Sequence, residues 1–168
     1  MQKSDLSSFL VSDNKESTFI LIKGRASFIN ASTFKKFIDA SLKKMSKYFV
    51  IDFKDCSGMD STFLGIVAWL GMEIKKSPNK SFLIVRNLNS RNSELFHNLG
   101  LQNFITTESS INTQNQEPEK EYSCLDSKDK IKASDILIAH KTLVEASKKN
   151  ASIFKDVIEI LESKKLKN

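Results

Sequence analysis

The sequence predicts an α/β fold, because short β-branched and aromatic runs alternate with amphipathic segments of helical period between residues 8 and 106. Alternation of this kind implies a sheet with right-handed crossovers and with interleaved helices packed on it. We expect a sheet of four to five strands, at residues 8–11, 17–23, 48–53 and 81–85, with a short fifth candidate at 103–106.

The first two strands are predicted to form a hairpin. The polar segment 12–16 between them is rich in Asp, Asn and Lys, which are turn residues. The run at 17–23 is β-branched and aromatic and is too short for a helix, and Gly24 ends it. Residues 48–53 are apolar at successive positions, as in strands covered on both faces, so we expect them to form the central strand.

The segment after Asn30 changes to a helical period. Its apolar residues recur at spacings of three and four with Lys and Asp between them, namely at Phe34, Phe37, Ile38, Leu42 and Met45. This pattern predicts an amphipathic helix that ends at residues 46–47.

Two more helices are predicted between the later strands. Residues 54–59 are expected to form a loop and residues 60–75 a helix, which ends before Pro78 because proline cannot continue it. A third helix is expected at 90–99, followed by Gly100 in the position that glycine favours just past a helix end.

The C-terminal third divides into a linker and a helical hairpin. Residues 107–130 are dominated by Ser, Asn, Gln, Glu and Lys and are predicted to link a domain at 1–106 to a hairpin extension at 131–168. Two apolar stripes, broken at residues 149–150, define the hairpin: Ile136, Leu137, His140, Leu143 and Val144, then Ile153, Phe154, Val157, Ile158 and Leu161. Two short helices bury little by themselves, so these stripes must cover the sheet domain, another copy or a partner.

Composition limits the classes of function. With 168 residues and 40% apolar content the chain can build a core, and its apolar runs are broken by polar residues too often for a membrane span. Only two cysteines occur, Cys56 and Cys124, widely spaced, which favours reduced thiols in the cytoplasm. The net charge of +6 is spread along the chain. The nearest approach to a basic patch is interpreted as a solvated helix face rather than a nucleic-acid site: Lys35, Lys36, Lys43, Lys44 and Lys47.

The residues that enzymes use most are not grouped in this sequence. His97 and His140 are far apart and have no Cys or Asp at ligand spacing, so neither is predicted to bind a metal or act in catalysis. Cys56 has no sequence cue for a base, and the 5 glycines do not cluster into a phosphate-binding loop. We therefore expect no enzyme activity, no cofactor and no metal.

Residues 59–65 are the most informative segment, because they join a buried strand to the first turn of a helix. The first amides of a helix lack internal acceptors and carry partial positive charge, which stabilises an oxyanion. Asp60 or Ser61 can cap this helix by accepting from an amide two or three residues on. A phosphate on Ser61 would add a charge of about −1.5 to −2 at a place that tolerates it.

This segment and the order of elements resemble the STAS family of anti-sigma factor antagonists over residues 8–106. In that family the helix start reads Asp-Ser-Ser or Asp-Ser-Thr, then Gly, an aliphatic residue and Gly, and a partner kinase phosphorylates the serine after the aspartate. The positions that match are Met59, Asp60, Ser61, Thr62, Leu64 and Gly65. The resemblance implies a STAS-like regulatory module in which Ser61 accepts the phosphate. The expected partner-binding residues are Asp60, Thr62, Phe63, Leu64, Gly65 and Trp69.

The partners implied by the resemblance are an anti-sigma factor with serine kinase activity and a serine phosphatase. A homodimer is a further option, and neither nucleic acid nor a membrane is expected as a direct partner. Two positions differ from the antagonists: Phe63 replaces a glycine and is more like the stressosome scaffold branch, and residues 24–27 read Gly-Arg-Ala-Ser where antagonists read Gly-Glu-Leu-Asp. The alternative function is therefore an oligomeric scaffold subunit without a phospho-switch.

The helix predicted at 60–75 has almost no polar face. A core stripe is supplied by Phe63, Leu64, Val67, Leu70 and Ile74, yet Ile66, Trp69 and Met72 are apolar too. Two interpretations stay open. Either the C-terminal hairpin covers the extra surface, or that surface is an interaction face beside Ser61 with Trp69 as its aromatic anchor.

Overall fold

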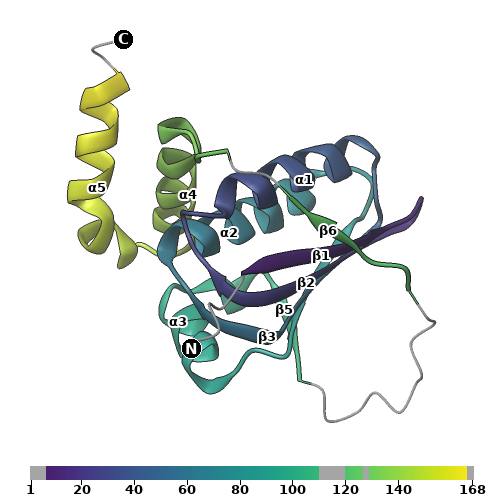
Figure 1. Cartoon of the computed structure of the whole chain (residues 1–168). Coiled ribbons are helices and arrows are strands. Elements are labelled where there is room, and N and C mark those ends of the chain that lie inside the picture. Colours follow the sequence, from purple (N-terminus) through teal and green to yellow (C-terminus); the bar gives the residue numbers. More distant parts are fainter. Residues whose placement is uncertain (1–6, 110–119, 127–128, 166–168) are drawn as a thin grey trace, which may run out of the picture.

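The protein is a mixed six-stranded sheet with helices packed on it, as seen in a computed structural model that describes residues 7–109, 120–126 and 129–165 (Figure 1). The strand order is β5-β4-β3-β2-β1-β6; β1 pairs antiparallel with β2 and β6, and β2 to β5 run parallel. The strands are β1 (Ser8–Asp13), β2 (Ser17–Ala26), β3 (Tyr48–Met59), β4 (Phe82–Arg86), β5 (Thr106–Glu108) and β6 (Ser123–Leu125). The predicted α/β fold is confirmed.

The helices include the predicted C-terminal pair. They are α1 (Ala31–Lys43), α2 (Ser61–Lys76), α3 (Ser90–Asn98), the short 3₁₀ helix η1 (Leu101–Asn103), α4 (Ala133–Ala146) and α5 (Asn150–Lys165). Figure 1 shows α1 and α2 side by side on the sheet, α4 standing next to α2, and α5 outermost. The hairpin is therefore attached to the domain through α2.

Four phenylalanines join the sheet to α1 and α2. Phe63 of α2 lies with its ring centroid 4.6 Å from Phe34 of α1, 5.8 Å from Phe9 of β1 and 6.4 Å from Phe53 of β3. All four side chains are fully buried. Aromatic pairs at these separations add to the area that they remove from water. Phe63 thus anchors the first turn of α2, the turn that carries Ser61.

The loop expected at 54–59 was wrong, because β3 continues without a break to Met59. Strand β2 also continues, to Ala26, and pairs with this part of β3 through two register shifts. The polar residues that suggested a loop alternate with buried ones, with Cys56 facing inward. Irregular pairing of this kind permits a long, bent strand with a polar outer face. As a result β3 leads directly into the helix start at residue 60.

The last strand was predicted three residues too early. Residues 101–103 form η1, and β5 follows at Thr106–Glu108. The apolar pair Phe104 and Ile105 suggested a strand, but Ile105 is buried in the connection, against Gly71 of α2.

The sheet gains a sixth strand, beyond the four to five expected, from the segment predicted as a polar linker. Strand β6 pairs with β1, with Phe9 opposite Leu125 and Val11 opposite Ser123. Without β6, β1 would present unpaired backbone groups at the sheet edge, so even a short polar segment is stabilised there. Residues 110–119 and 127–128 of the same segment lie outside the described residues.

The hairpin covers the domain of its own chain, which settles what its apolar stripes contact. Helix α4 packs against α2, and α5 packs chiefly on α4. The closest approach is at Gly65, where an added Cβ would lie 2.5 Å from the carbonyl oxygen of Ala139. Near the turn of the hairpin, the buried Asn150 amide donates to Leu99 O at 3.0 Å and to Leu143 O at 2.7 Å. The turn is therefore tied to the end of α3.

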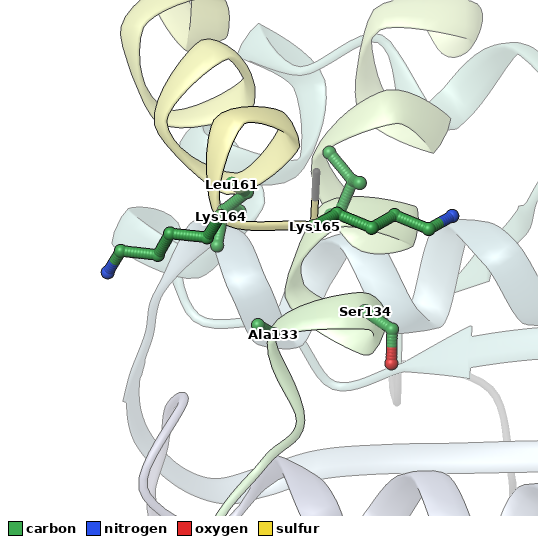
Figure 2. Close-up of a pocket in the computed structure, with 6 residues that line it drawn as sticks. Ala133, Ser134, Leu161, Lys164 and Lys165 are labelled. Atoms are coloured by element: carbon green, nitrogen blue, oxygen red, sulfur yellow. The ribbon is translucent and has the colours of Figure 1, made fainter. Parts of the chain in front are cut away.

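The opposite end of the hairpin is more open. A cavity of about 200 Å³ separates the start of α4 from the end of α5 and is lined by Ala133, Ser134, Leu137, Leu161, Lys164 and Lys165. Figure 2 shows the two lysine side chains pointing away from each other at this opening. Phe154, near the turn, is buried, whereas Ile160, further along α5, is exposed. Helix α5 thus contacts α4 through Phe154 near the turn and through an ion pair between Lys141 and Glu162 further along.

Candidate functional site

Asp60 fixes the start of α2. Its backbone is extended, with φ −115° and ψ 173°, and its Oδ1 accepts from the Phe63 amide at 2.9 Å, which makes it the N-cap. Its Oδ2 accepts from the Phe28 amide at 2.8 Å, so the same carboxylate also holds the loop before α1. Of the two predicted capping candidates, Asp60 is the cap and Ser61 is the first helical residue. The Ser61 hydroxyl is thereby free for another partner.

That partner is His140 of α4. The Ser61 Oγ lies 3.1 Å from His140 Nε2, and His140 Nδ1 lies 2.8 Å from the carbonyl oxygen of Ile136. Because a carbonyl only accepts, Nδ1 carries a proton; in the neutral imidazole Nε2 is then an acceptor, and the Ser61 hydroxyl donates to it. The ring is 4% exposed and packs edge-on against Phe154 at 5.0 Å. Helix α4 therefore presents a fixed acceptor to the hydroxyl.

Sequence reasoning placed His140 in the apolar stripe of the hairpin but missed its contact with Ser61. The two residues are 79 positions apart, and only the docking of α4 on α2 brings them together. A histidine within an otherwise aliphatic stripe was the available signal, since a buried imidazole needs a polar partner. His97 is exposed on α3. Among the described residues, no group of three His, Cys, Asp or Glu side chains is arranged to hold a metal ion.

The residues predicted to bind a partner lie in two environments. Asp60 and Ser61 are half-buried at the surface. Phe63 and Leu64 are fully buried in the core, and the positions Thr62 and Gly65 are also buried. In this arrangement Asp60 and Ser61 are partly accessible, with the Ser61 hydroxyl lying against His140, while the other four shape the turn beneath them.

Trp69 is half-buried, and a lysine ammonium group lies over its ring. The Nζ of Lys35 lies 3.9 Å from the ring centroid and also pairs with Asp39 at 2.7 Å. The interpretation of Lys35 as part of a solvated face was therefore wrong: its ammonium group lies over the indole and its side chain is 11% exposed. The other four lysines of that set are exposed.

A pair of exposed apolar side chains beside this site was not foreseen. Phe28 and Ile29 are 54% and 74% exposed, and the Phe28 amide is the one bound to Asp60. Adjacent exposed apolar residues next to a polar group are typical of protein contact surfaces. Their sequence signal was an apolar dipeptide between Ser27 and Asn30, outside any predicted element.

Cys56 lies on β3, shortly before Asp60 in the chain, and its thiol is buried. Burial raises the pKa of its thiol, and the Sγ donates to Gly58 O at 3.4 Å. Cys124 is exposed on β6.

We expect only Cys124 to react with a thiol reagent in the folded protein. Cys56 should react slower by about two orders of magnitude, since its raised pKa keeps it protonated and exchange requires local opening. Titration with an aromatic disulfide near pH 8, with Cys124→Ser as the control, measures both rates. Fast labelling of Cys124→Ser under native conditions would contradict this assignment.

Comparison with known proteins identifies the family. The STAS domain matches residues 11–114 of the chain. This protein belongs to the STAS domain family. The hairpin α4–α5 lies beyond the matched residues, and the site at Asp60 and Ser61 lies within them.

Solved structures agree with this assignment at the level of the fold. An anti-sigma factor antagonist from Mycobacterium paratuberculosis superposes with a TM-score of 0.56 at 18% identity, covering 66% of this chain and 92% of the other. The unphosphorylated form of the anti-sigma factor antagonist SpoIIAA gives a TM-score of 0.54 at 17% identity, covering 61% and 89%. The phosphorylated form of SpoIIAA, a Bacillus cell fate determinant, gives 0.50 at 17%, covering 61% and 92%. No curated protein sequence matches the chain.

No helix within the described parts of this STAS protein is long and apolar enough to cross a membrane.

Proposed function

We propose that this STAS domain is a non-catalytic regulatory module that binds another protein through the surface around Ser61 and is switched by phosphorylation of Ser61. The observation that carries the proposal is the placement of a half-exposed serine as the first residue of α2, immediately after a side chain that caps the helix. The exposed pair Phe28 and Ile29 adjoins it and supplies apolar contact area.

The switch would be electrostatic. The N-terminal end of α2 carries partial positive charge, so a phosphate on Ser61 is tolerated by the fold. The same phosphate places a charge of about −1.5 to −2 next to the Asp60 carboxylate, in a surface that a partner would have to desolvate. A partner bound to the unmodified surface is therefore released by modification, and its return requires dephosphorylation.

Membership of the STAS family and the likeness to anti-sigma factor antagonists support an anti-sigma factor as the partner of this chain. By that resemblance the partner is an anti-sigma factor with serine kinase activity, and a serine phosphatase resets the switch. Localisation in the cytoplasm goes with this proposal.

A scaffold subunit is the second candidate, and two observations favour it. The Ser61 hydroxyl is bound by His140, and the position where antagonists carry an aspartate is the buried Ser27. In a scaffold, this closed arrangement would be permanent and the protein would act by self-association. Size-exclusion chromatography with light scattering separates the two: a stable higher oligomer favours the scaffold.

The contact between Ser61 and His140 also has two of the groups found in hydrolases that use a serine nucleophile. In those enzymes a carboxylate orients the histidine and stabilises its charged form. Here the orienting group is the neutral carbonyl of Ile136, one turn earlier in the same helix. This contact is therefore better suited to holding α4 against α2 than to activating a nucleophile.

The phosphorylation proposal is tested by mass spectrometry. The protein is incubated with ATP and a kinase-containing lysate, and we expect phosphate on Ser61, lost completely in Ser61→Ala. Ser90 is a matched control because it is also the first residue of a helix behind an Asx cap, Asn89, and is exposed. Ser90→Ala should keep full phosphorylation. Phosphate recovered elsewhere, with Ser61 unmodified, would refute the switch.

A further inference from the structure

Helix α4 lies directly on the first two turns of α2. His140 contacts the Ser61 hydroxyl, and the Ala139 backbone meets Gly65 so closely that an added Cβ would lie 2.5 Å from its carbonyl oxygen and 2.7 Å from its Cβ. Ser61 and Gly65 are four residues apart and so share one face of α2. The contact therefore combines a hydrogen bond with a backbone approach that only glycine allows.

The docked position of α4 engages the hydroxyl that a kinase would modify. The 3.1 Å between Ser61 Oγ and His140 Nε2 is the length of one hydrogen bond. A phosphoryl group on that oxygen adds three further oxygens, and a kinase must bring its phosphate donor to the same atom. Transfer of a phosphoryl group to this oxygen requires that its hydrogen bond to His140 be broken.

The hairpin lies beyond the part of the chain that matches the STAS family. It lies outside residues 11–114, and about nine-tenths of each antagonist chain is matched by 61–66% of this one. Helix α2 is joined to the sheet by Phe9, Phe34, Phe53 and Phe63, none of which belongs to the hairpin, although Ala139, Leu143 and Phe154 of the hairpin border the same buried core. Helix α5 packs chiefly on α4, so both helices can move together without separating the four phenylalanines.

We infer that α4 is an intramolecular cover of the Ser61 face of α2, held by the bond from Ser61 to His140 and by the close contact of Gly65 with Ala139. The inference rests on the proposed function of Ser61. The kinase and the binding partner reach the Ser61 face of α2 only when α4 moves away. Phosphorylation of Ser61 then prevents α4 from returning.

Hydrogen exchange with mass spectrometry on the full chain tests the cover without any kinase. In the native protein we expect amides of α4 to exchange at least about 10-fold faster than those of β3, because α4 opens without unfolding the sheet. Gly65→Ala should accelerate exchange in α4 by a further factor of about 10 while β3 stays protected. Equal exchange of α4 and β3 in both proteins would overturn the inference, since α4 would then open only by global unfolding.

Two controls separate the cover from general destabilisation. Gly71→Ala strains the same helix at a different contact, where the new Cβ would lie 2.9 Å from Ile105 Cγ1, so α4 and β3 should keep their native ratio of exchange rates. His140→Ala, which adds no volume, should accelerate α4, whereas His97→Ala on the exposed face of α3 should not. Acceleration by Gly71→Ala as large as that by Gly65→Ala would overturn the inference.

Ser61→Glu tests the effect of charge. We expect faster amide exchange in α4, because the longer acidic side chain removes the hydroxyl that bonds to His140 at 3.1 Å. Slower exchange would mean that the acid pairs with His140 and holds α4 closed, which contradicts the inference.

The link to phosphorylation is measured separately. In the lysate assay, Gly65→Ala should be phosphorylated on Ser61 several-fold faster than Gly71→Ala. Absence of phosphate on Ser61 in every variant, with α4 still opening independently, would refute the proposed switch and leave the cover standing.

Discussion

Phe63→Ala is expected to lower the free energy of unfolding by about 3–5 kcal/mol, the range for removing a buried aromatic ring from a packed core. The ring contacts three other phenylalanines from β1, β3 and α1, and all four are fully buried. Small domains have about 5–15 kcal/mol in total, so the variant should lose a large part of its stability. Urea unfolding followed by circular dichroism measures the change.

Two further variants serve as comparisons for Phe63→Ala. Phe63→Leu keeps most of the volume and should cost about 1.5 kcal/mol or less if the cluster repacks. Phe28→Ala removes the same side chain from an exposed loop and should change stability by less than about 0.5 kcal/mol. A loss at Phe63 no larger than that at Phe28 would show that the aromatic cluster does not support the start of α2.

The buried position of Phe63 also explains how this chain differs from the antagonists at that residue. Antagonists of the STAS family commonly have glycine where this chain has Phe63. Because Phe63 points into the core, the substitution leaves the outward surface of the turn to Asp60 and Ser61. The aromatic residue therefore changes how the turn is supported rather than what it presents, and the resemblance to the scaffold branch at this position does not by itself argue against the proposed phosphorylation of Ser61.

Asn150→Ala is expected to destabilise the protein by about 1–3 kcal/mol, because it leaves Leu99 O without a donor and leaves Leu143 O with the Ser147 amide alone. The Asn150 amide donates to Leu99 O and Leu143 O, which belong to the end of α3 and to α4. Its own Oδ1 is buried without a hydrogen-bond partner, which offsets part of the loss when the side chain is removed. The rate of amide hydrogen exchange, measured by mass spectrometry, should rise most in α4 and α5.

The matched variant is Asn98→Ala, which removes an exposed asparagine from the end of α3. It should leave stability within about 0.5 kcal/mol of the native protein. Equal unfolding free energies for the two asparagine variants, measured in urea, would show that the hairpin turn is not tied to α3 through Asn150.

The alternation of strands and helices could be predicted because it depends on short-range periodicity. Side chains two residues apart share a strand face, and those three or four apart share a helix face, so the pattern of apolar residues within each segment is sufficient. The start of α2 was equally local: a capping residue accepts from amides only two or three positions away, and Asp60 does so. The hairpin followed from its two stripes in the same way.

The errors and omissions share one cause, which is dependence on distant partners. Residues 54–59 look like a loop until β2 pairs with them, and residues 123–125 look like a linker until β1 does. Lys35 looks solvated until Trp69 of the neighbouring helix places its ring against the Lys35 ammonium group. Each of these residues has a local pattern that fits two conformations, and a segment elsewhere in the chain selects between them.

The candidate site also has a part that depends on consecutive residues and a part that depends on residues far apart in the sequence. Asp60, Ser61 and the helix that they begin are properties of consecutive residues, so the order of residues was enough to predict where this helix begins and to propose Ser61 as its phosphate acceptor. What lies over that hydroxyl depends on how α4 docks, because His140 approaches from 79 positions away and the approach is possible only where Gly65 meets Ala139. Local periodicity specifies which faces are apolar, but the choice of the surface against which each face packs is made by shape and polar pairing in three dimensions.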